Sequence, residues 1–164
     1  ILYRISSRGF DMEYTGIKMG KELDNSIHAL IEYDYSGLLG VEAATSYWGL
    51  STFPYNIPIF LVNDNAMNEN GYSVDSALAM LFVPNVNTEN IVRLSKHLSV
   101  TDPEQTVCDM VRYNRHEFHL FETLLHAYEG DVDRERLEEL AKQYHILDKM
   151  KHLYQEALAV EDEG

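Results

Sequence analysis

Three carboxylates in the middle of the chain are of the residue types that bind cations. Asp102, Glu104 and Asp109 lie close together in the sequence, and grouped carboxylates can hold the metal ion of a metal-dependent nuclease. No lysine follows them in a strand beside a second carboxylate, as such a site would require. Carboxylates also stabilise the positive end of a helix dipole. We therefore predict that these residues begin and cap a helix, with a nuclease-like enzyme as the alternative.

A second candidate group combines histidine and glutamate at helical spacing. His119, Glu122 and His126 are three and four residues apart, so one helix face would carry them all and could hold a metal ion. His116 and His119 are three residues apart, not four as in a zinc-protease helix. Zinc also needs ligands from elsewhere in a protein. We therefore predict a solvated polar stripe, with no metal, cofactor or catalytic residue in the chain.

The sequence lacks the patterns of phosphate loops and offers one thiol. It contains no Gly-x-x-x-x-Gly-Lys-[Ser/Thr] loop and no Gly-x-Gly-x-x-Gly. Cys108, between Val107 and Met110, is expected to be a small buried hydrophobe of a helix and not a nucleophile. A lone cysteine cannot form an internal disulfide, which indicates a reducing compartment.

Length and charge limit the class of protein. With 164 residues, of which 45% are hydrophobic, the chain can bury one core and is about one domain long. The formal net charge of −14 argues against a broad basic face for nucleic acid and suits either a basic protein partner or simple solubility. No apolar run approaches the roughly 20 residues of a membrane span, and the amino terminus lacks a signal-peptide pattern. We predict a cytoplasmic protein without membrane contact.

The elements that must position these residues alternate between helices and strands. Apolar residues at helical spacing predict a helix over residues 21–35, and a second helix over 41–48 is ended by Gly49. Short apolar runs predict strands over residues 59–62, 78–83 and 91–94, and residues 98–100 lead into the next helix. That helix spans residues 101–110, with Thr101 and Glu104 as a capping box and Pro103 in the first turn.

The last third of the chain is predicted to be helical. Residues 115–128 carry apolar side chains at helical spacing, Phe118 among them, and Gly130 would end that helix. Residues 132–158 repeat apolar positions every three or four residues, and their stripe is expected to face the core in preference to a partner. The sequence therefore predicts an α/β (α+β) fold, in which a small mixed β-sheet packs with helices and a C-terminal helical cap follows.

Two further groups of residues are candidates for binding. Residues 1–10 alternate apolar and polar side chains like one arm of a β-hairpin and carry Arg4 and Arg8. Around Gly49, aromatic side chains could anchor a partner or fill the core between helix and sheet, and we favour the core. The aromatic candidates for partner binding are Tyr47, Trp48 and Tyr55, of which Tyr55 is expected to be the most exposed.

Two segments resemble a known family when they are taken together. Glu42-Ala43-Ala44-Thr45-Ser46-Tyr47-Trp48-Gly49-Leu50 is followed by an apolar strand and then by Thr101-Asp102-Pro103-Glu104-Gln105-Thr106-Val107-Cys108-Asp109. In this order and spacing the segments resemble AbiEi-type antitoxins of bacterial type IV toxin–antitoxin and abortive infection systems. Gln105 stands where that family usually has arginine, and Glu42-Ala43-Ala44 replaces the commoner Ser-Ala-Leu.

The resemblance implies a domain order and a function. Residues 1–12 would be the last strand of an N-terminal winged helix-turn-helix that binds operator DNA, with Arg4 and Arg8 as remnants of the DNA contact. Residues 13–160 would be the antitoxin domain. The resemblance implies a non-enzymatic antitoxin and transcriptional autoregulator, whose functional partner is a nucleotidyltransferase-like toxin with no need of a stable complex. A protein-interaction module and the nuclease-like enzyme remain the alternatives.

The same resemblance distinguishes this chain from the toxin. Toxins of such systems resemble nucleotidyltransferases, in which a Gly-Ser turn precedes an Asp-x-Asp pair that holds magnesium. The chain offers Asp131 and Asp133 at a helix start, without that turn. We therefore expect the antitoxin partner and not the toxin.

Overall fold

The computed structural model describes residues 27, 29–32, 34–52, 58–63 and 79–164. The candidate DNA-contacting residues Arg4 and Arg8 lie outside the described residues, as does Tyr55. Of the helix predicted over residues 21–35, the described residues 27 and 29–32 are helical. The other elements can be compared with the sequence directly.

The strands of the described residues form a five-stranded mixed sheet in the order β3-β2-β1-β5-β4. Its strands are β1 (Gly37–Leu39), β2 (Ile59–Asn63), β3 (Ala79–Val83), β4 (Ile91–Arg93) and β5 (Leu98–Thr101). The central strand β1 runs parallel to β5 and antiparallel to β2. The outer pairs are parallel β2 and β3 and antiparallel β4 and β5. The predicted strands correspond to β2, β3 and β4.

The sequence did not predict β1, although this strand lies at the centre of the sheet. Leu38 and Leu39 are fully buried in it. A Cβ atom on Gly37 would overlap the ring of Phe60 on the neighbouring strand, so β1 requires glycine at this close approach. A run of three residues shows no clear period, so residues 37–39 carry no local signal for a strand.

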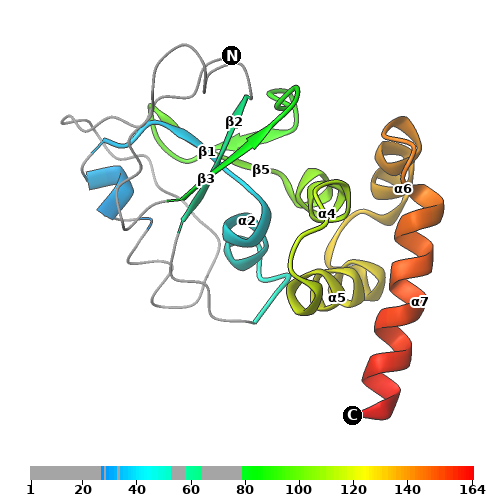
Figure 1. Cartoon of the computed structure of the whole chain (residues 1–164). Helices are drawn as coiled ribbons and strands as arrows, with labels where there is room; N and C mark the ends of the chain where they lie inside the picture. Colours follow the sequence, from blue (N-terminus) through cyan, green and yellow to red (C-terminus); the bar gives the residue numbers. More distant parts are fainter. Residues whose placement is uncertain (1–26, 28, 33, 53–57, 64–78) are drawn as a thin grey trace.

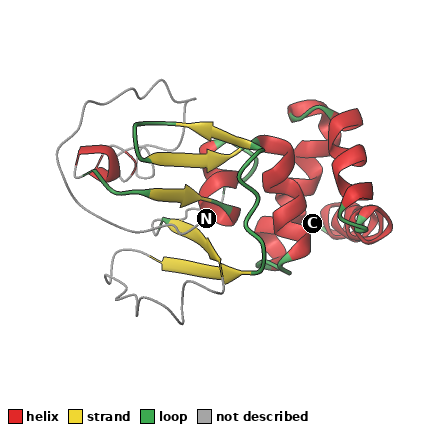
Figure 2. Ribbon diagram, turned by 90° about the horizontal axis from the view of Figure 1, so that it is seen from above, coloured by secondary structure: helices red, strands yellow, loops and turns green. Residues whose placement is uncertain are grey.

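Apart from the helical residues 29–32, which lie on the other side, the described helices gather on one side of the sheet, as Figures 1 and 2 show. They are α2 (Val41–Tyr47), α4 (Pro103–Arg112), α5 (Glu117–His126) with the π turn η1 (Ala127–Asp131), α6 (Arg134–Gln143) and α7 (Leu147–Glu163). Helix α2 packs against α4, α5 and β2, and α4 in turn packs against α6. Helix α7 packs on α5 and lies farthest from the sheet (Figure 1).

The start of α4 differs by one residue from the predicted capping box. The N-cap is Asp102, whose carboxylate accepts a hydrogen bond from the Gln105 backbone N–H at 2.8 Å. Thr101 cannot serve as the cap because it is the last residue of β5 and pairs with Ile91 of β4. Pro103 occupies the first turn as predicted, where its missing N–H leaves no intrahelical bond unmade.

The helical region after Gly130 also differs from its predicted form. Residues 132–158 form two helices, since α6 ends at Gln143 and α7 begins at Leu147. His145 between them has a left-handed backbone with φ of 57°, which turns the chain away from the axis of α6. Phe118, predicted on the apolar face of α5, is 53% exposed.

One hydrophobic core joins the sheet to the helices. Its buried members include Leu38, Phe60, Val100, Met110 and Leu124, which come from the sheet, α4 and α5. The predicted α/β fold with its C-terminal helical cap is confirmed. Among the described residues, no helix has the length and apolar character needed to span a membrane.

Candidate functional site

The two segments that carry the family resemblance are in direct contact. The Trp48 indole N–H, at the end of α2, donates a hydrogen bond to the Thr101 carbonyl at 2.7 Å. Tyr47 meets Trp48 edge-on, with ring centroids 4.9 Å apart. Tyr47 is 2% exposed and belongs to the core, whereas Trp48 is partly buried. Of the two aromatic candidates that the structure describes, only Trp48 therefore reaches the surface.

Two of the three candidate cation ligands instead bind an arginine from α6. The Arg136 guanidinium lies 2.6 Å from the Asp102 carboxylate and also pairs with Glu104. The hydrogen bonds that Arg136 donates to Asp102 and Glu104 raise the pKa of the guanidinium. The second guanidinium N–H₂ group also donates to Asn90 Oδ1 at 3.3 Å. The arginine therefore lies between the two carboxylates, pairs with both and offsets one of their two negative charges.

The third carboxylate, Asp109, belongs to a separate and more deeply buried pair. It is 2% exposed and accepts hydrogen bonds from Gln105 Nε2 at 2.8 Å and from Arg112 Nη1 at 3.0 Å. Burial raises the pKa of Asp109 to about 6, although Arg112 and Gln105 oppose this shift. Asp109 therefore does not join Asp102 and Glu104 in a common site.

Gln105 connects these two arrangements. Its Oε1 accepts hydrogen bonds from Asn90 Nδ2 at 3.0 Å and from the Tyr144 hydroxyl at 3.1 Å. The Arg112 guanidinium lies 3.8 Å from the centroid of the Tyr144 ring. This network was not predicted from the sequence, because its members come from α4, from the end of α6 and from the residues before β4. No local spacing relates such distant positions.

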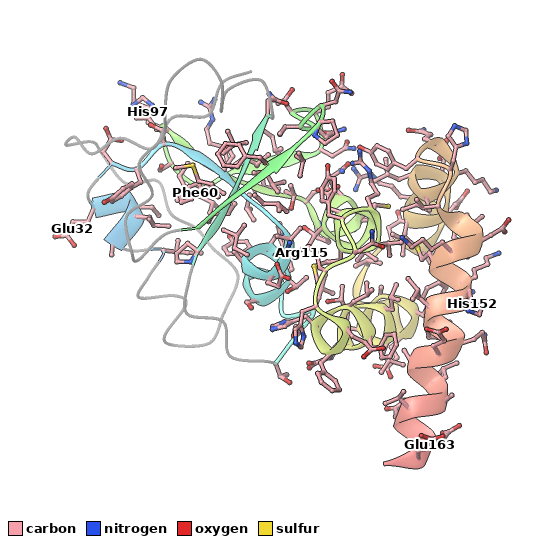
Figure 3. The ribbon with its side chains drawn as sticks, in the orientation of Figure 1. Glu32, Phe60, His97, Arg115, His152 and Glu163 are labelled. Carbon is pink, nitrogen blue, oxygen red and sulfur yellow. The ribbon has the colours of Figure 1, made fainter. Side chains whose placement is uncertain are left out.

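Glu42, the acidic residue in the first of the two segments that resemble the family, is also paired with a cation. Glu42, in the first turn of α2, is 3% exposed, and Arg115 Nε lies 2.9 Å and 3.1 Å from its two carboxylate oxygens. Figure 3 labels Arg115 beside α2, on the connection between α4 and α5. A buried carboxylate at a helix start is thus matched by a cation and by the positive end of the helix.

The histidine and glutamate face of α5 meets the segment that follows α2. Ser51 Oγ lies 3.1 Å from His119 Nδ1 and 3.2 Å from Glu122 Oε2. The other oxygen of Glu122 accepts hydrogen bonds from the Thr52 backbone N–H at 2.7 Å and from the Thr52 hydroxyl at 2.5 Å. His119 is 7% exposed. The predicted solvated stripe is therefore wrong at His119, because α2 and its following residues cover it.

This arrangement is neither a catalytic triad nor a metal centre. In a triad the acid bonds to the histidine, whereas Glu122 here bonds to Ser51 and Thr52. His126 turns its Nδ1 to Asp131 at 2.9 Å, and its Nε2 lies 3.8 Å from Glu122. In the described part of the chain, no group of three His, Cys, Asp or Glu side chains is arranged to hold a metal ion.

Cys108 has the environment of a core residue. It is fully buried on α4, as predicted, and burial raises the pKa of its thiol. The nearby Asp109 charge adds to this rise. Cys108 is therefore held as a thiol, which is a poor nucleophile.

The chain has no match among protein-family models or among curated proteins. Its function is therefore inferred from its own residues. The strongest relationship for that inference is the contact of Trp48 with Thr101.

Proposed function

We propose that this chain is a non-enzymatic antitoxin of the AbiEi type, and that residues 13–160 form mainly its toxin-neutralising domain. The contact of Trp48 with Thr101 carries the proposal. The two sequence segments that resemble the family are separated by strands β2, β3, β4 and most of β5, yet α2 and α4 pack together. Segments that act as one signature are expected to form one structural unit.

Where the chain departs from the family pattern, its buried acidic residues still have cationic partners. At position 105 glutamine replaces the usual arginine, one turn before Asp109. Gln105 still donates a hydrogen bond to Asp109, and Arg112 supplies the positive charge from the following turn. A cation and a buried carboxylate are thus paired on α4 although residue 105 is glutamine. Likewise, Glu42 is balanced by Arg115.

The charge distribution indicates that different parts of the proposed antitoxin bind DNA and neutralise the toxin. After Thr101, acidic residues far outnumber lysine and arginine, so this part of the chain would repel a phosphate backbone. We assign binding of operator DNA to the N-terminal winged helix-turn-helix, of which residues 1–12 would be the last strand and Arg4 and Arg8 DNA-contacting remnants. We assign neutralisation to the rest of the chain, including this acidic part, with the nucleotidyltransferase-like toxin as the functional partner in the cytoplasm.

The nuclease-like alternative is less well supported. A cation between Asp102 and Glu104 would have to displace Arg136, which pairs with both carboxylates. Removing the arginine would leave α6 without its bonds to the start of α4. The carboxylates therefore have a structural role that accounts for their presence.

A growth-rescue experiment tests the proposal. The neighbouring operon gene is induced in a naive host with no antitoxin, with this chain, or with this chain carrying its native upstream residues. We expect the neighbour to arrest growth and this chain to restore it. A harmless neighbour, or arrest that persists with both forms of the antitoxin, would refute the proposal. Rescue only by the longer form would show that the winged domain contributes to neutralisation.

A matched variant separates the antitoxin from the enzyme. Asp102→Asn combined with Glu104→Gln removes both charges while keeping the side-chain shapes, and asparagine remains a good N-cap. We expect this double variant to rescue growth as well as the parent chain does, provided that circular dichroism shows it folded. Loss of rescue by the folded variant would favour metal-dependent catalysis. Stable pull-down of a different partner, without growth rescue, would favour the protein-interaction module.

A further inference from the structure

The sheet has an edge strand whose outward backbone groups are available to a further strand. In the described part of the chain, β4 is the last strand of the sheet and pairs with β5 alone. The Leu94 N–H bonds to the Leu98 carbonyl at 2.9 Å, and the Asn90 carbonyl accepts from the residue after β5 at 3.0 Å. In an antiparallel pair, the residues between such positions turn their N–H and C=O groups the other way. Ile91 and Arg93 therefore direct their backbone groups away from β5.

The side chains along this edge are also exposed. Val92, in the middle of β4, is 36% exposed although it is a large hydrophobic residue. Glu89 before the strand, and Arg93 and Lys96 at its other end, are exposed as well. Proline and bulges commonly block a sheet edge. Strand β4 contains no proline, and its pairing with β5 continues without a bulge, so a further strand can approach it.

A second copy of β4 fits this edge in an antiparallel register centred on Val92. Ile91 then lies opposite Arg93 of the second copy, and Arg93 lies opposite its Ile91. Since the backbone groups of both residues point outward, each of these two pairs can exchange both of its hydrogen bonds. Val92 meets Val92 of the second copy in a pair that is not hydrogen-bonded, where side chains approach most closely. The exposed apolar side chain of each copy is thereby covered by the other.

The charges along the edge favour this antiparallel arrangement. Glu89 lies before β4, whereas Arg93 and Lys96 lie at its end and beyond it. Two antiparallel copies place the basic end of each strand beside Glu89 of the other, whereas two parallel copies would place like charges together. In the register centred on Val92, Arg93 and Glu89 of the second copy are diagonal neighbours on one face, within reach of long side chains. The edge is therefore complementary to itself.

We propose that β4 is a self-association edge, at which two copies of the chain join their sheets about a two-fold axis. Such a contact uses the same surface of both copies, as a self-complementary edge requires. Strand β4 has only three residues, so the contact is smaller than that of a permanent dimer. The dimer therefore forms reversibly and at high protein concentration. This inference is independent of the antitoxin function.

Sedimentation equilibrium of the whole chain, from micromolar to millimolar concentration, tests the proposal. We expect the dimer fraction to rise with concentration. Arg93→Pro should abolish the dimer, because it removes an outward N–H while leaving every hydrogen bond to β5 in place. Arg93→Ala keeps that N–H and should weaken association less, and circular dichroism checks that both variants fold. A chain that stays monomeric throughout, or a dimer that Arg93→Pro leaves unchanged, would overturn the proposal.

Disulfide cross-linking tests the register. Opposite residues of a pair that is not hydrogen-bonded have Cα atoms about 4.5 Å apart, which a disulfide can span. With oxidised glutathione as the oxidant, Val92→Cys should give a covalent dimer, whereas Lys96→Cys, exposed beyond the end of β4, should give far less. The native Cys108 is fully buried and does not contribute. Equal cross-linking of the two variants, or none at position 92, would refute the register.

Charge reversal tests the pairing of the two ends of the edge. Glu89→Arg and Arg93→Glu should each weaken association several-fold, because each places like charges beside one another. The double variant restores opposite charges at both ends and should recover the association of the parent chain. A double variant weaker than both single variants would contradict the antiparallel arrangement.

Discussion

Arg112 Nη1 lies 3.0 Å from Asp109 Oδ1 on α4, where the aspartate side chain is almost fully buried. The guanidinium also stacks at 3.8 Å from the Tyr144 ring centroid, between α4 and the end of α6. A buried carboxylate is tolerated when it is paired, and it becomes costly when its partner is removed. The stacking of Arg112 on Tyr144 therefore connects this ion pair of α4 to the end of α6 in the helical cap.

Arg112→Ala is expected to destabilise the protein by about 3 kcal/mol, because Asp109 would remain buried without its cation. Urea unfolding of the two proteins measures the difference. Arg134→Ala is the control, since Arg134 is 62% exposed and pairs with Glu138 across one helical turn. The control should cost at most about 1 kcal/mol. Equal losses in the two variants would contradict the importance of the buried pair.

The titration of Asp109 should be visible in the pH dependence of stability. Its pKa is raised to about 6 in the folded protein, first of all by burial. The folded protein therefore binds this proton more tightly than the unfolded chain does. The resulting stability is fully present below about pH 4 and is lost as the pH rises through 6, by ~3 kcal/mol.

Asp109→Asn provides the measurement. Asparagine can still accept from Gln105 but does not titrate. The free energy of unfolding, measured from pH 3.5 to 7, should show that the parent chain loses stability relative to the variant as the pH rises. A difference between the two proteins that does not change with pH would contradict the raised pKa.

Trp48 should report whether the sheet and the helices unfold together. It is the only tryptophan of the chain, and its indole N–H is bonded to Thr101 at the junction of α2 with β5. Far-ultraviolet circular dichroism reports mostly on α4 to α7. Since one core joins both regions, we expect coincident urea transitions by tryptophan fluorescence and by circular dichroism. Separate midpoints would show that the helical cap unfolds independently.

The sequence predicted the elements whose signals are local. The helix ended by Gly49 is α2, and the apolar run beginning at Ile59 is β2. Pro103 correctly marked the first turn of α4. Each of these assignments depends on residues within one or two turns of one another, which is the range over which propensity and periodicity act.

The features that the sequence missed depend on contacts between distant residues. The central strand β1 exists because Gly37 pairs with Leu98 on β5, far along the chain. The pairing of β5 with β4 also moved the helix cap from Thr101 to Asp102. The pairing of Arg136 with Asp102 and Glu104 could not be predicted from the sequence, because more than thirty residues separate the arginine from these carboxylates. The buried network of the candidate site was therefore beyond local reasoning.

His145 is a single exposed residue, yet it divides a continuous apolar repeat into α6 and α7. Its φ of 57° is left-handed, a conformation that costs a residue with a Cβ atom roughly 1 kcal/mol relative to glycine. The backbone N–H groups of His145 and Ile146 bond to Lys142 and Ala141, which is the usual end of a helix at a left-handed residue. Glycine at position 145 would retain these bonds without the steric cost.

His145→Gly is therefore expected to stabilise the protein by up to about 1 kcal/mol, less the entropy that glycine adds to the unfolded chain. Thermal and urea unfolding measure the change. His145→Ala is the matched control, since alanine removes the imidazole but keeps the Cβ atom, and it should give no such gain. If glycine destabilised the protein while alanine stabilised it, residues 132–158 would prefer one continuous helix, and the turn between α6 and α7 would be contradicted.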